Sequence, residues 1–309
     1  MSLLDWVMAV VALSIAVFLL TPWLVERFRT PMDVEEARVK APGEFATLPS
    51  GVTHYRWFGP ENGPVIVCVH GLSTPSFGYV GLATALSMKG WRVLTYDLYG
   101  RGYSDNVPGP QDIDFFLTQL DELLEHQDVT GRFTIFGYSM GGLIATAYTE
   151  RSPRRINQMM LIASAGVAPL LKATAGLAKV RSIPFLNRWL GIVFGGRALR
   201  KYINDEIGAD PVRQRQIEQT HRRGYWPALM SSQQHALTMD FEQKHRKIAE
   251  LEVPVLAIWA RNDQVIPIEA LGHLAQWNRA ARQEILEDAQ HGLTYSHPKE
   301  IAEFFLRNI

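Results

Sequence analysis

Residues 136–142 read FGYSMGG and decide the fold. An apolar run at 133–136 leads into them and a helix-like stretch at 140–151 follows, so the G-x-S-x-G pattern lies where a strand turns sharply into a helix. Such a turn raises the Ser139 hydroxyl above the end of a sheet, beside the unpaired amide groups of a helix N-terminus. Gly137 and Gly141 avoid the collision that a Cβ would cause where the chain reverses. The pattern predicts that Ser139 is a nucleophile.

Apolar, β-rich runs alternate with helix-like stretches along most of the chain. The runs occupy residues 64–69, 91–96, 133–136, 159–163, 255–259 and, more weakly, 284–286, and the helix-like stretches lie near 77–89, 112–127, 140–151, 268–279 and 299–308. Continuous apolar runs are typical of strands that are buried on both faces. The alternation predicts an α/β protein with a mostly parallel central sheet and helices on both faces. Cys68, the single cysteine, is interpreted as a core residue.

A serine hydroxyl is a weak nucleophile until a base removes its proton, so a histidine and an orienting acid must accompany Ser139. In this topology they follow the serine in the order acid, then histidine. Asp263 comes just after the run at 255–259, and His291 comes just after the run at 284–286. Both lie at strand ends, where the sites of open α/β sheets assemble. We therefore predict a catalytic triad of Ser139, Asp263 and His291.

The other histidines and nearby acids fit this role less well. His297 directly precedes Pro298 and is interpreted as a helix-entry residue, and Asp288 is only three residues before His291. His54, His126 and His273 lie outside any strand-end context and are interpreted as surface residues. The remaining candidates lie in the helical region described below: His221, His235, His245 and Asp240.

Two backbone N–H groups must meet the negative charge that develops on the substrate oxygen. One is expected from Met140, directly after the nucleophile, and the other from Leu72, in the loop after the first apolar run. His70 is interpreted as a structural residue that braces this loop, and Asp97 and Arg101 as residues that fix a neighbouring loop. No group of His, Cys or carboxylate residues has metal-site spacing, and no phosphate-binding glycine pattern is present. The sequence therefore predicts neither a metal nor a cofactor.

The N-terminal residues 6–25 form a stretch of 20 residues without a charge. A helix of that length measures roughly 30 Å, the thickness of the hydrocarbon core of a bilayer. A cleaved signal peptide would need a basic n-region, which is missing, and a buried core helix would usually show a polar face. We predict a single-pass anchor over residues 1–25 and a polar tether over 26–44. Because four Lys and Arg follow the span and none precedes it, the catalytic body is expected in the cytoplasm.

Residues 167–250 interrupt the alternation with helix-like sequence, and we interpret them as a helical cap inserted between two parts of the core, 45–166 and 251–309. The cap holds 14 Lys and Arg against 7 Asp and Glu, although the whole chain is neutral, with 31 of each. The excess of basic residues suits contact with an anionic membrane surface. The alternative interpretation is an ordinary cap over a pocket, with its charges solvated. The neutral chain gives no support to a nucleic-acid partner. Five cap residues are expected to line an acyl-binding tunnel: Trp189, Phe194, Tyr225, Trp226 and Met230.

The motif order HG-L-S, D-x-x-G-x-G-x-S, G-Y-S-M-G, N-D and Q-H-G resembles the α/β-hydrolase superfamily over about residues 45–309. With its anchor and cap, the chain is similar to membrane-bound monoacylglycerol lipases. The resemblance implies an α/β-hydrolase fold and a serine hydrolase that cleaves carboxylic esters of lipophilic substrates through an acyl-enzyme. A serine nucleophile argues against haloalkane dehalogenases and epoxide hydrolases, which use an aspartate. Hydrolysis of a C–C bond or an acyl thioester by the same triad, and an inactive ligand-binding protein, stay open as alternatives.

Overall fold

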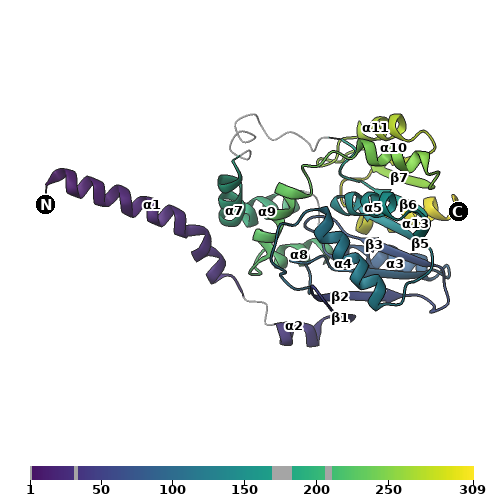
Figure 1. Ribbon diagram of the computed structural model, residues 1–309, viewed down its shortest axis with the longest axis horizontal. Coiled ribbons are helices and arrows are strands. Elements are labelled where there is room, and N and C mark those ends of the chain that lie inside the picture. The colour runs from purple at the N-terminus through teal and green to yellow at the C-terminus, as the bar shows by residue number, and fades with distance from the viewer. Residues whose placement is uncertain (1, 31–33, 169–182, 206–210) are drawn as a thin grey trace.

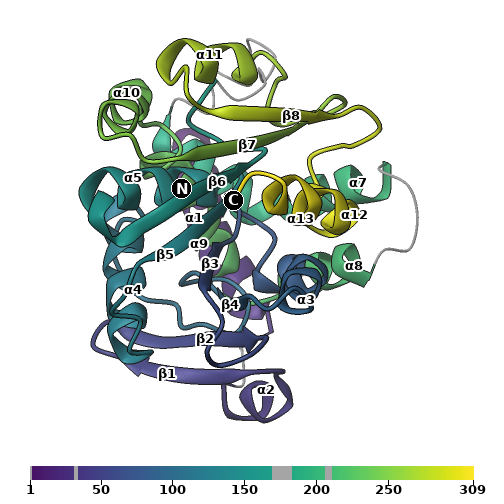
Figure 2. The same ribbon diagram turned by 90° about the vertical axis from the view of Figure 1, so that its right-hand side faces the viewer.

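The computed structural model describes residues 2–30, 34–168, 183–205 and 211–309. Its centre is an eight-stranded sheet (Figures 1 and 2). The strands lie in the order β1-β2-β4-β3-β5-β6-β7-β8; β1 and β2 run antiparallel to their neighbours, and β3 to β8 are parallel. Their bounds are β1 Glu44–Leu48, β2 Gly51–Phe58, β3 Val65–Val69, β4 Arg92–Tyr96, β5 Phe133–Tyr138, β6 Ile156–Ile162, β7 Val255–Ala260 and β8 Arg282–Leu286. The predicted fold class, a mostly parallel α/β sheet, is confirmed.

The hairpin of β1 and β2 is the part of the sheet that the sequence analysis does not predict. Its second strand contains Thr53, His54 and Arg56, which interrupt the apolar run. Thr53 and His54 are nevertheless buried, because polar partners meet them. The Oγ1 of Thr53 accepts the side-chain amide of Gln119 at 2.9 Å, and Nδ1 of His54 lies 2.7 Å from a carboxylate oxygen of Asp97.

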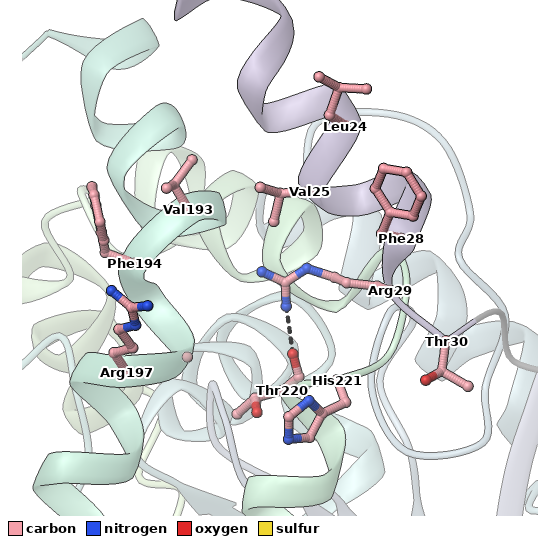
Figure 3. A pocket seen from close by; sticks show the side chains of 11 residues that line it. Leu24, Val25, Phe28, Arg29, Thr30, Val193, Phe194, Arg197, Thr220 and His221 are labelled. Atoms are coloured by element: carbon pink, nitrogen blue, oxygen red, sulfur yellow. Dashed lines mark hydrogen bonds between the residues drawn. The ribbon is translucent and has the colours of Figure 1, made fainter.

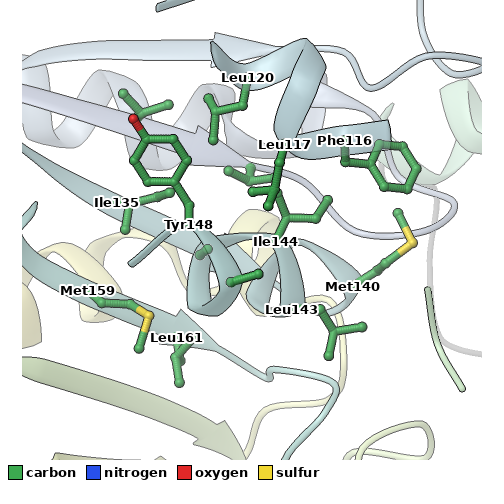
Figure 4. Close-up of a cluster of buried hydrophobic side chains, with 14 of the residues drawn as sticks. Phe116, Leu117, Leu120, Ile135, Met140, Leu143, Ile144, Tyr148, Met159 and Leu161 are labelled. Carbon is green, nitrogen blue, oxygen red and sulfur yellow. The ribbon is translucent and has the colours of Figure 1, made fainter. Parts of the chain in front are cut away.

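Helices cover both faces of the sheet, as predicted. One face carries α3 (Val80–Ser87), α12 (Leu293–Ser296) and α13 (Pro298–Leu306), and the other carries α4 (Ile113–His126), α5 (Met140–Arg151), α10 (Glu242–Glu250) and α11 (Ala270–Trp277). Alternate residues of each strand feed the two cores, because successive side chains of a strand point to opposite faces. Figure 4 shows the core beneath α4 and α5, where Leu117, Leu120 and Ile144 gather with Ile135 and Met159. Cys68 is fully buried in the opposite core, as expected of a core residue.

The cap consists of α7 (Pro184–Asp205), α8 (Pro211–Gln219) and α9 (Tyr225–His235), and α7 packs against the other two. Two glycines of α7 permit this close packing. A Cβ at Gly191 would lie 2.0 Å from Sδ of Met230, and a Cβ at Gly195 would lie 2.4 Å from the ring of Trp226. The backbone of α7 therefore rests directly on the large side chains of α9.

The helix α10 does not belong to the cap, although the sequence analysis extends the cap to residue 250. It packs against α5 and α11, and Ile248 is fully buried in the core of that face of the sheet. His245, on the same helix, is also buried and stacks on Trp277 with ring centroids 5.9 Å apart. The predicted boundary is wrong because the amphipathic pattern of α10 serves the core of the sheet.

The N-terminal helix α1 (Leu3–Phe28) projects from the body of the protein (Figure 1). It is 26 residues long, and none of its most apolar window is buried within the protein. By length and composition it is long and apolar enough to cross a membrane, as an anchor or a signal segment does. The helix continues past the predicted end of the anchor at residue 25.

The first residues of the predicted tether are held by the cap. The guanidinium of Arg223 donates hydrogen bonds to the carbonyl oxygens of Glu26, Arg27 and Arg29 at 3.1, 2.6 and 3.3 Å. The carboxylate of Glu26 accepts the N–H of Gly224 at 2.9 Å. We call this contact, between residues 26–30 and 220–224, the clasp. The polar tether predicted over 26–44 is thus corrected: it begins as the end of α1 docked on the cap, and it later contains the short helix α2 (Val34–Lys40).

Candidate active site

Ser139 lies between β5 and α5 in a backbone conformation that few L-residues adopt, with φ of 53° and ψ of −120°. Such a conformation costs about 1–3 kcal/mol and persists where the surroundings enforce it. Close packing enforces it here, because a Cβ at Gly141 would lie 2.1 Å from the carbonyl oxygen of Val69. The N–H of Ser139 also donates to the carbonyl oxygen of Ile162 at 3.0 Å. The predicted strand-to-helix turn is present, with the serine at its apex.

His291 lies within hydrogen-bond distance of both other residues of the predicted triad. Nε2 of His291 is 3.0 Å from Oγ of Ser139, and Nδ1 of His291 is 2.7 Å from Oδ2 of Asp263. Asp263 is buried, and its Oδ1 accepts the N–H groups of Val265 and Ile266 at 2.7 and 2.9 Å. A carboxylate held in this way keeps the proton on Nδ1 and makes Nε2 the acceptor for the serine proton. The arrangement can activate Ser139 for attack on a carbonyl carbon.

Tyr138 joins the nucleophile turn to the loop that carries His291. Its hydroxyl donates to the carbonyl oxygen of His291 at 3.0 Å, and the two rings lie 5.3 Å apart at an interplanar angle of 35°. The sequence analysis does not single out this residue, because a tyrosine before the serine carries no signal of a partner 153 residues away.

The two predicted oxyanion donors come from two segments that meet at Ser139. Met140 is the first residue of α5, and the first N–H groups of a helix have no acceptor within that helix. Leu72 lines the same pocket as Ser139. The preceding residue brings the loop close, because a Cβ at Gly71 would lie 3.1 Å from Cβ of Ser139.

His70 braces this loop, as predicted. Its Nε2 accepts the N–H of Leu98 at 2.9 Å, so Nδ1 carries the proton that it donates to the carbonyl oxygen of Gly71 at 2.7 Å. Burial lowers the pKa of His70 to about 4, although the nearby carboxylate of Asp97 opposes that shift. The imidazole is therefore neutral and holds a fixed tautomer at neutral pH.

Asp97 fixes two loops beside the site, as predicted, but its main partner is unexpected. Its carboxylate accepts the N–H groups of Ser76 and Tyr103 at 2.8 and 2.9 Å. It also contacts His54, which the sequence analysis interprets as a surface residue and which is in fact buried. That interpretation is wrong because a strand-end carboxylate 43 residues away compensates the imidazole for the loss of water.

Arg101 ties the same region to the cap. Its guanidinium is buried and donates to the carbonyl oxygen of Leu72 at 3.2 Å and to Oγ of Ser232, on α9, at 2.7 Å. Burial lowers the pKa of Arg101 to about 9. Because the expected oxyanion loop and the cap share this cation, the position of α9 is coupled to the position of Leu72.

Ser139 and His291 open into a pocket of ≈ 670 Å³ beneath the cap. Three of the five predicted tunnel residues line it: Phe194, Trp226 and Met230. The sequence analysis misses further lining residues at helical spacing on α7 and α9, such as Leu190 and Leu229. Their spacing was visible in the sequence, but it does not reveal which face of a helix turns toward the serine.

The other two predicted tunnel residues have different roles. Nε1 of Trp189 donates to the carbonyl oxygen of Phe18 on α1 at 2.8 Å, and the two rings stack at 4.8 Å. The buried Tyr225 donates its hydroxyl to the carbonyl oxygen of Ser73 at 3.1 Å. Trp189 thus packs against the N-terminal helix and Tyr225 supports the loop after β3, and neither lines the catalytic pocket.

His297 lies at the entry to the last helix, away from the catalytic contacts. Nε2 of His297 lies 3.5 Å from Oδ1 of Asp288, directly before α13, which fits the interpretation of His297 as a helix-entry residue. Within the described residues, no group of three or more His, Cys, Asp or Glu side chains is arranged to hold a metal ion.

The sequence model of the alpha/beta hydrolase fold family matches residues 64–298, which include all three members of the predicted triad. The chain belongs to the α/β-hydrolases. Two similar members act on different substrates, by their names. A 2-hydroxy-6-oxononadienedioate/2-hydroxy-6-oxononatrienedioate hydrolase of Cupriavidus pinatubonensis is 24% identical over 82% of this chain and 91% of its own length. A pimeloyl-[acyl-carrier protein] methyl ester esterase of Aeromonas hydrophila is 24% identical over 78% of this chain and 93% of its own length.

A solved structure resembles this α/β-hydrolase along nearly its whole length. It is described as a membrane phospholipase A, a bacterial virulence factor, and is 19% identical with a TM-score of 0.70. The match covers 99% of each chain. This α/β-hydrolase is therefore a hydrolytic enzyme by family, and its fold is found in other proteins of known structure.

Proposed function

We propose that this α/β-hydrolase is a membrane-anchored serine hydrolase that cleaves carboxylic esters of lipophilic substrates, of which monoacylglycerols are one class. One observation carries the proposal: Nε2 of His291 lies 3.0 Å from Oγ of Ser139, at the base of a largely apolar pocket beneath the cap. Leu190, Leu229 and Met230 belong to its apolar wall and suit an acyl chain.

The geometry supports a two-step mechanism through an acyl-enzyme. Ser139 attacks the ester carbonyl carbon while His291 takes the hydroxyl proton, and Asp263 stabilises the imidazolium that forms. The N–H groups of Leu72 and Met140 stabilise the negative charge on the carbonyl oxygen. The C–O bond to the alcohol then breaks as His291 donates its proton to the leaving oxygen. A water molecule deprotonated by His291 then attacks the carbonyl carbon of the acyl-enzyme. The bond from that carbon to Oγ of Ser139 breaks as His291 returns the proton to Oγ, and the carboxylic acid is released.

The proposed anchor is α1. Its 26 residues span about 39 Å, enough to cross a bilayer. Its apolar surface is exposed, and a structural neighbour whose match covers 99% of this chain is described as a membrane phospholipase A. The basic residues after the helix favour a cytoplasmic catalytic body. The basic cap would then face an anionic lipid surface.

Hydrolysis of a C–C bond is the second candidate, because relatives named for that reaction match most of the chain. The same triad serves both reactions, so the choice depends on the substrate and not on Ser139. Acyl thioesters use the same carbonyl chemistry. An inactive ligand-binding protein is disfavoured, because the nucleophile, base and acid are all in contact.

The experiment is a substrate panel with wild type and Ser139→Ala. We expect wild type to hydrolyse p-nitrophenyl esters and monoacylglycerols faster than an acyl thioester or a C–C-cleavable diketone. We expect Ser139→Ala to lose about 10⁴-fold or more in turnover and to lose labelling by a fluorophosphonate, with an unchanged thermal unfolding midpoint. Full esterase activity in Ser139→Ala would refute the assignment of the nucleophile.

A further inference from the structure

A second cavity lies outside the catalytic pocket, between the C-terminal part of α1 and α7 (Figure 3). We call it the α1–α7 cavity; its volume is ≈ 590 Å³. The apolar wall comes from Leu24, Val25 and Phe28 of α1 and from Val193 and Phe194 of α7. Leu24, Phe28 and Phe194 are exposed by 40, 85 and 44%. Much apolar surface therefore faces open space at the point where α1 meets the body.

The rim of the α1–α7 cavity toward the body is basic. Arg29, Arg197 and His221 line it, and none of its described lining residues is Asp or Glu. The guanidinium of Arg29 is engaged with the carbonyl oxygens of Ile192 and Thr220 and forms an ion pair with the carboxylate of Glu26 at 2.7 Å. The exposed Arg197 and His221 therefore supply the basic character of the rim. An apolar wall next to a basic rim matches an amphiphile that has an acyl chain and a polar or anionic head.

Phe194 lines both the α1–α7 cavity and the catalytic pocket. On α7 the stripe with Leu190 faces the catalytic pocket, whereas Val193 and Arg197 face the second cavity, and Phe194 lies where the two stripes meet. The residue after Phe194 is a glycine that packs directly on a tryptophan of α9, so it adds no side chain to this wall. One half-exposed phenylalanine ring therefore stands between the two spaces at this point.

The level of the α1–α7 cavity along α1 indicates what fills it. The helix rises about 1.5 Å per residue, so residues 3–23 account for roughly the 30 Å of a bilayer core. Leu24 and Phe28 then lie where lipid chains meet their head groups. A lipid of the same leaflet reaches this level by lateral diffusion, with its head beside the exposed Arg197 and His221.

We infer that the α1–α7 cavity is an antechamber that receives an acyl chain of a membrane-resident ester and passes it, beside Phe194, into the pocket of Ser139. This inference rests on the proposed function and adds to it the route and the physical state of the substrate. The substrate enters from the bilayer, while a small water-soluble ester reaches Ser139 without using the α1–α7 cavity.

The test compares two esters with the same leaving group and different routes. The full-length protein is reconstituted in phosphatidylcholine vesicles, and turnover is measured for p-nitrophenyl palmitate in the vesicles and for p-nitrophenyl acetate in the water. The variants Leu24→Trp and Val193→Trp fill the α1–α7 cavity, and neither residue lines the catalytic pocket. Leu20→Trp is the matched control, because it makes the same change one turn earlier on α1, outside the residues that line the cavity.

The measured quantity is the ratio of palmitate to acetate turnover, which does not depend on how much of a variant folds. We expect this ratio to fall about tenfold in Leu24→Trp and in Val193→Trp, and to stay at the wild-type value in Leu20→Trp. A wild-type ratio in both cavity variants would overturn the antechamber and leave the proposed function intact. A wild-type protein that hydrolyses neither ester would instead refute the proposed function.

Discussion

The carboxylate of Asp97 lies 2.7 Å from Nδ1 of His54, and both side chains are buried. Burial disfavours the charged imidazole, but the charge of Asp97, the hydrogen bond to it and a second one to the carbonyl oxygen of Pro42 together raise the pKa of His54. Burial likewise opposes the charge of Asp97, and the contact with His54 lowers its pKa well below the usual range. A buried ion pair thus holds the β1–β2 hairpin to the loops beside Ser139.

Removal of one partner of this pair should be costly. We expect Asp97→Ala to lower the free energy of unfolding by about 3–5 kcal/mol, because the buried ring of His54 and the N–H groups of Ser76 and Tyr103 lose their acceptor. The matched control is Asp121→Ala, which breaks the ion pair between Arg151 and Asp121. Their side chains are 42 and 47% exposed, so the loss of unfolding free energy should be less than about 1 kcal/mol. Urea unfolding of both variants in detergent measures the difference. Equal losses of unfolding free energy in the two variants would show that the buried pair stabilises the fold no more than the exposed pair.

The stability of the fold should decline in acid because of His245. Its ring nitrogens have no partner among the described residues, and burial lowers its pKa to about 4. In the unfolded chain the pKa of His245 has its ordinary value of 6.5, so between pH 6.5 and 4 the unfolded chain binds a proton that the folded protein does not. The free energy of unfolding is therefore lost as the pH falls from 6.5 toward 4. We expect His245→Phe, which keeps the stacking on Trp277, to reduce the loss between pH 7 and pH 4.5 by about 2–3 kcal/mol.

Unfolding free energies of wild type and His245→Phe at the two pH values test this. His70, whose pKa is also lowered to about 4, contributes in the same direction and is unchanged in the variant, so some acid sensitivity should persist. An identical pH dependence in the two proteins would contradict the prediction.

Tyr138 should affect turnover through the position of His291. We expect Tyr138→Phe to lower kcat about three- to tenfold at unchanged KM, because it loses the hydrogen bond to the carbonyl oxygen of His291 and keeps the ring contact. The control is Tyr79→Phe, which loses a comparable 3.2 Å hydrogen bond to the carbonyl oxygen of Val69. If Tyr79→Phe lowered kcat equally, the effect would reflect general loosening of the fold. Steady-state kinetics with p-nitrophenyl acetate measure both.

Local patterns made the sheet and the triad contacts predictable. The runs from β3 to β7 are apolar enough to stand out, whereas β8 (RQEIL) gives only a weak signal. The order of Ser139, Asp263 and His291 follows from the ends of parallel strands meeting at one edge. The nucleophile turn carries its own signal, since the glycine beside Val69 tolerates no side chain. These features depend on neighbours in sequence or on topology alone.

The remaining features depend on partners far apart in the chain. His54 is buried only because Asp97 meets it, and α10 joins the core only because Ile248 finds the side chains of α5 there. Trp189 turns to Phe18 of α1, 171 residues away, and not to the pocket on the next face of its own helix. The composition of these segments does not distinguish the two orientations.

The clasp joins the N-terminal helix to the cap, because Arg223 binds three carbonyl groups within about one turn at the end of α1. A bilayer whose thickness does not match α1 must tilt the helix or deform around it. With α1 in the membrane as proposed, such a tilt would reach the cap through the clasp, and Arg101 joins α9 of the cap to the loop of Leu72. A change in membrane thickness would thereby change the orientation of the mouth of the catalytic pocket relative to the lipid.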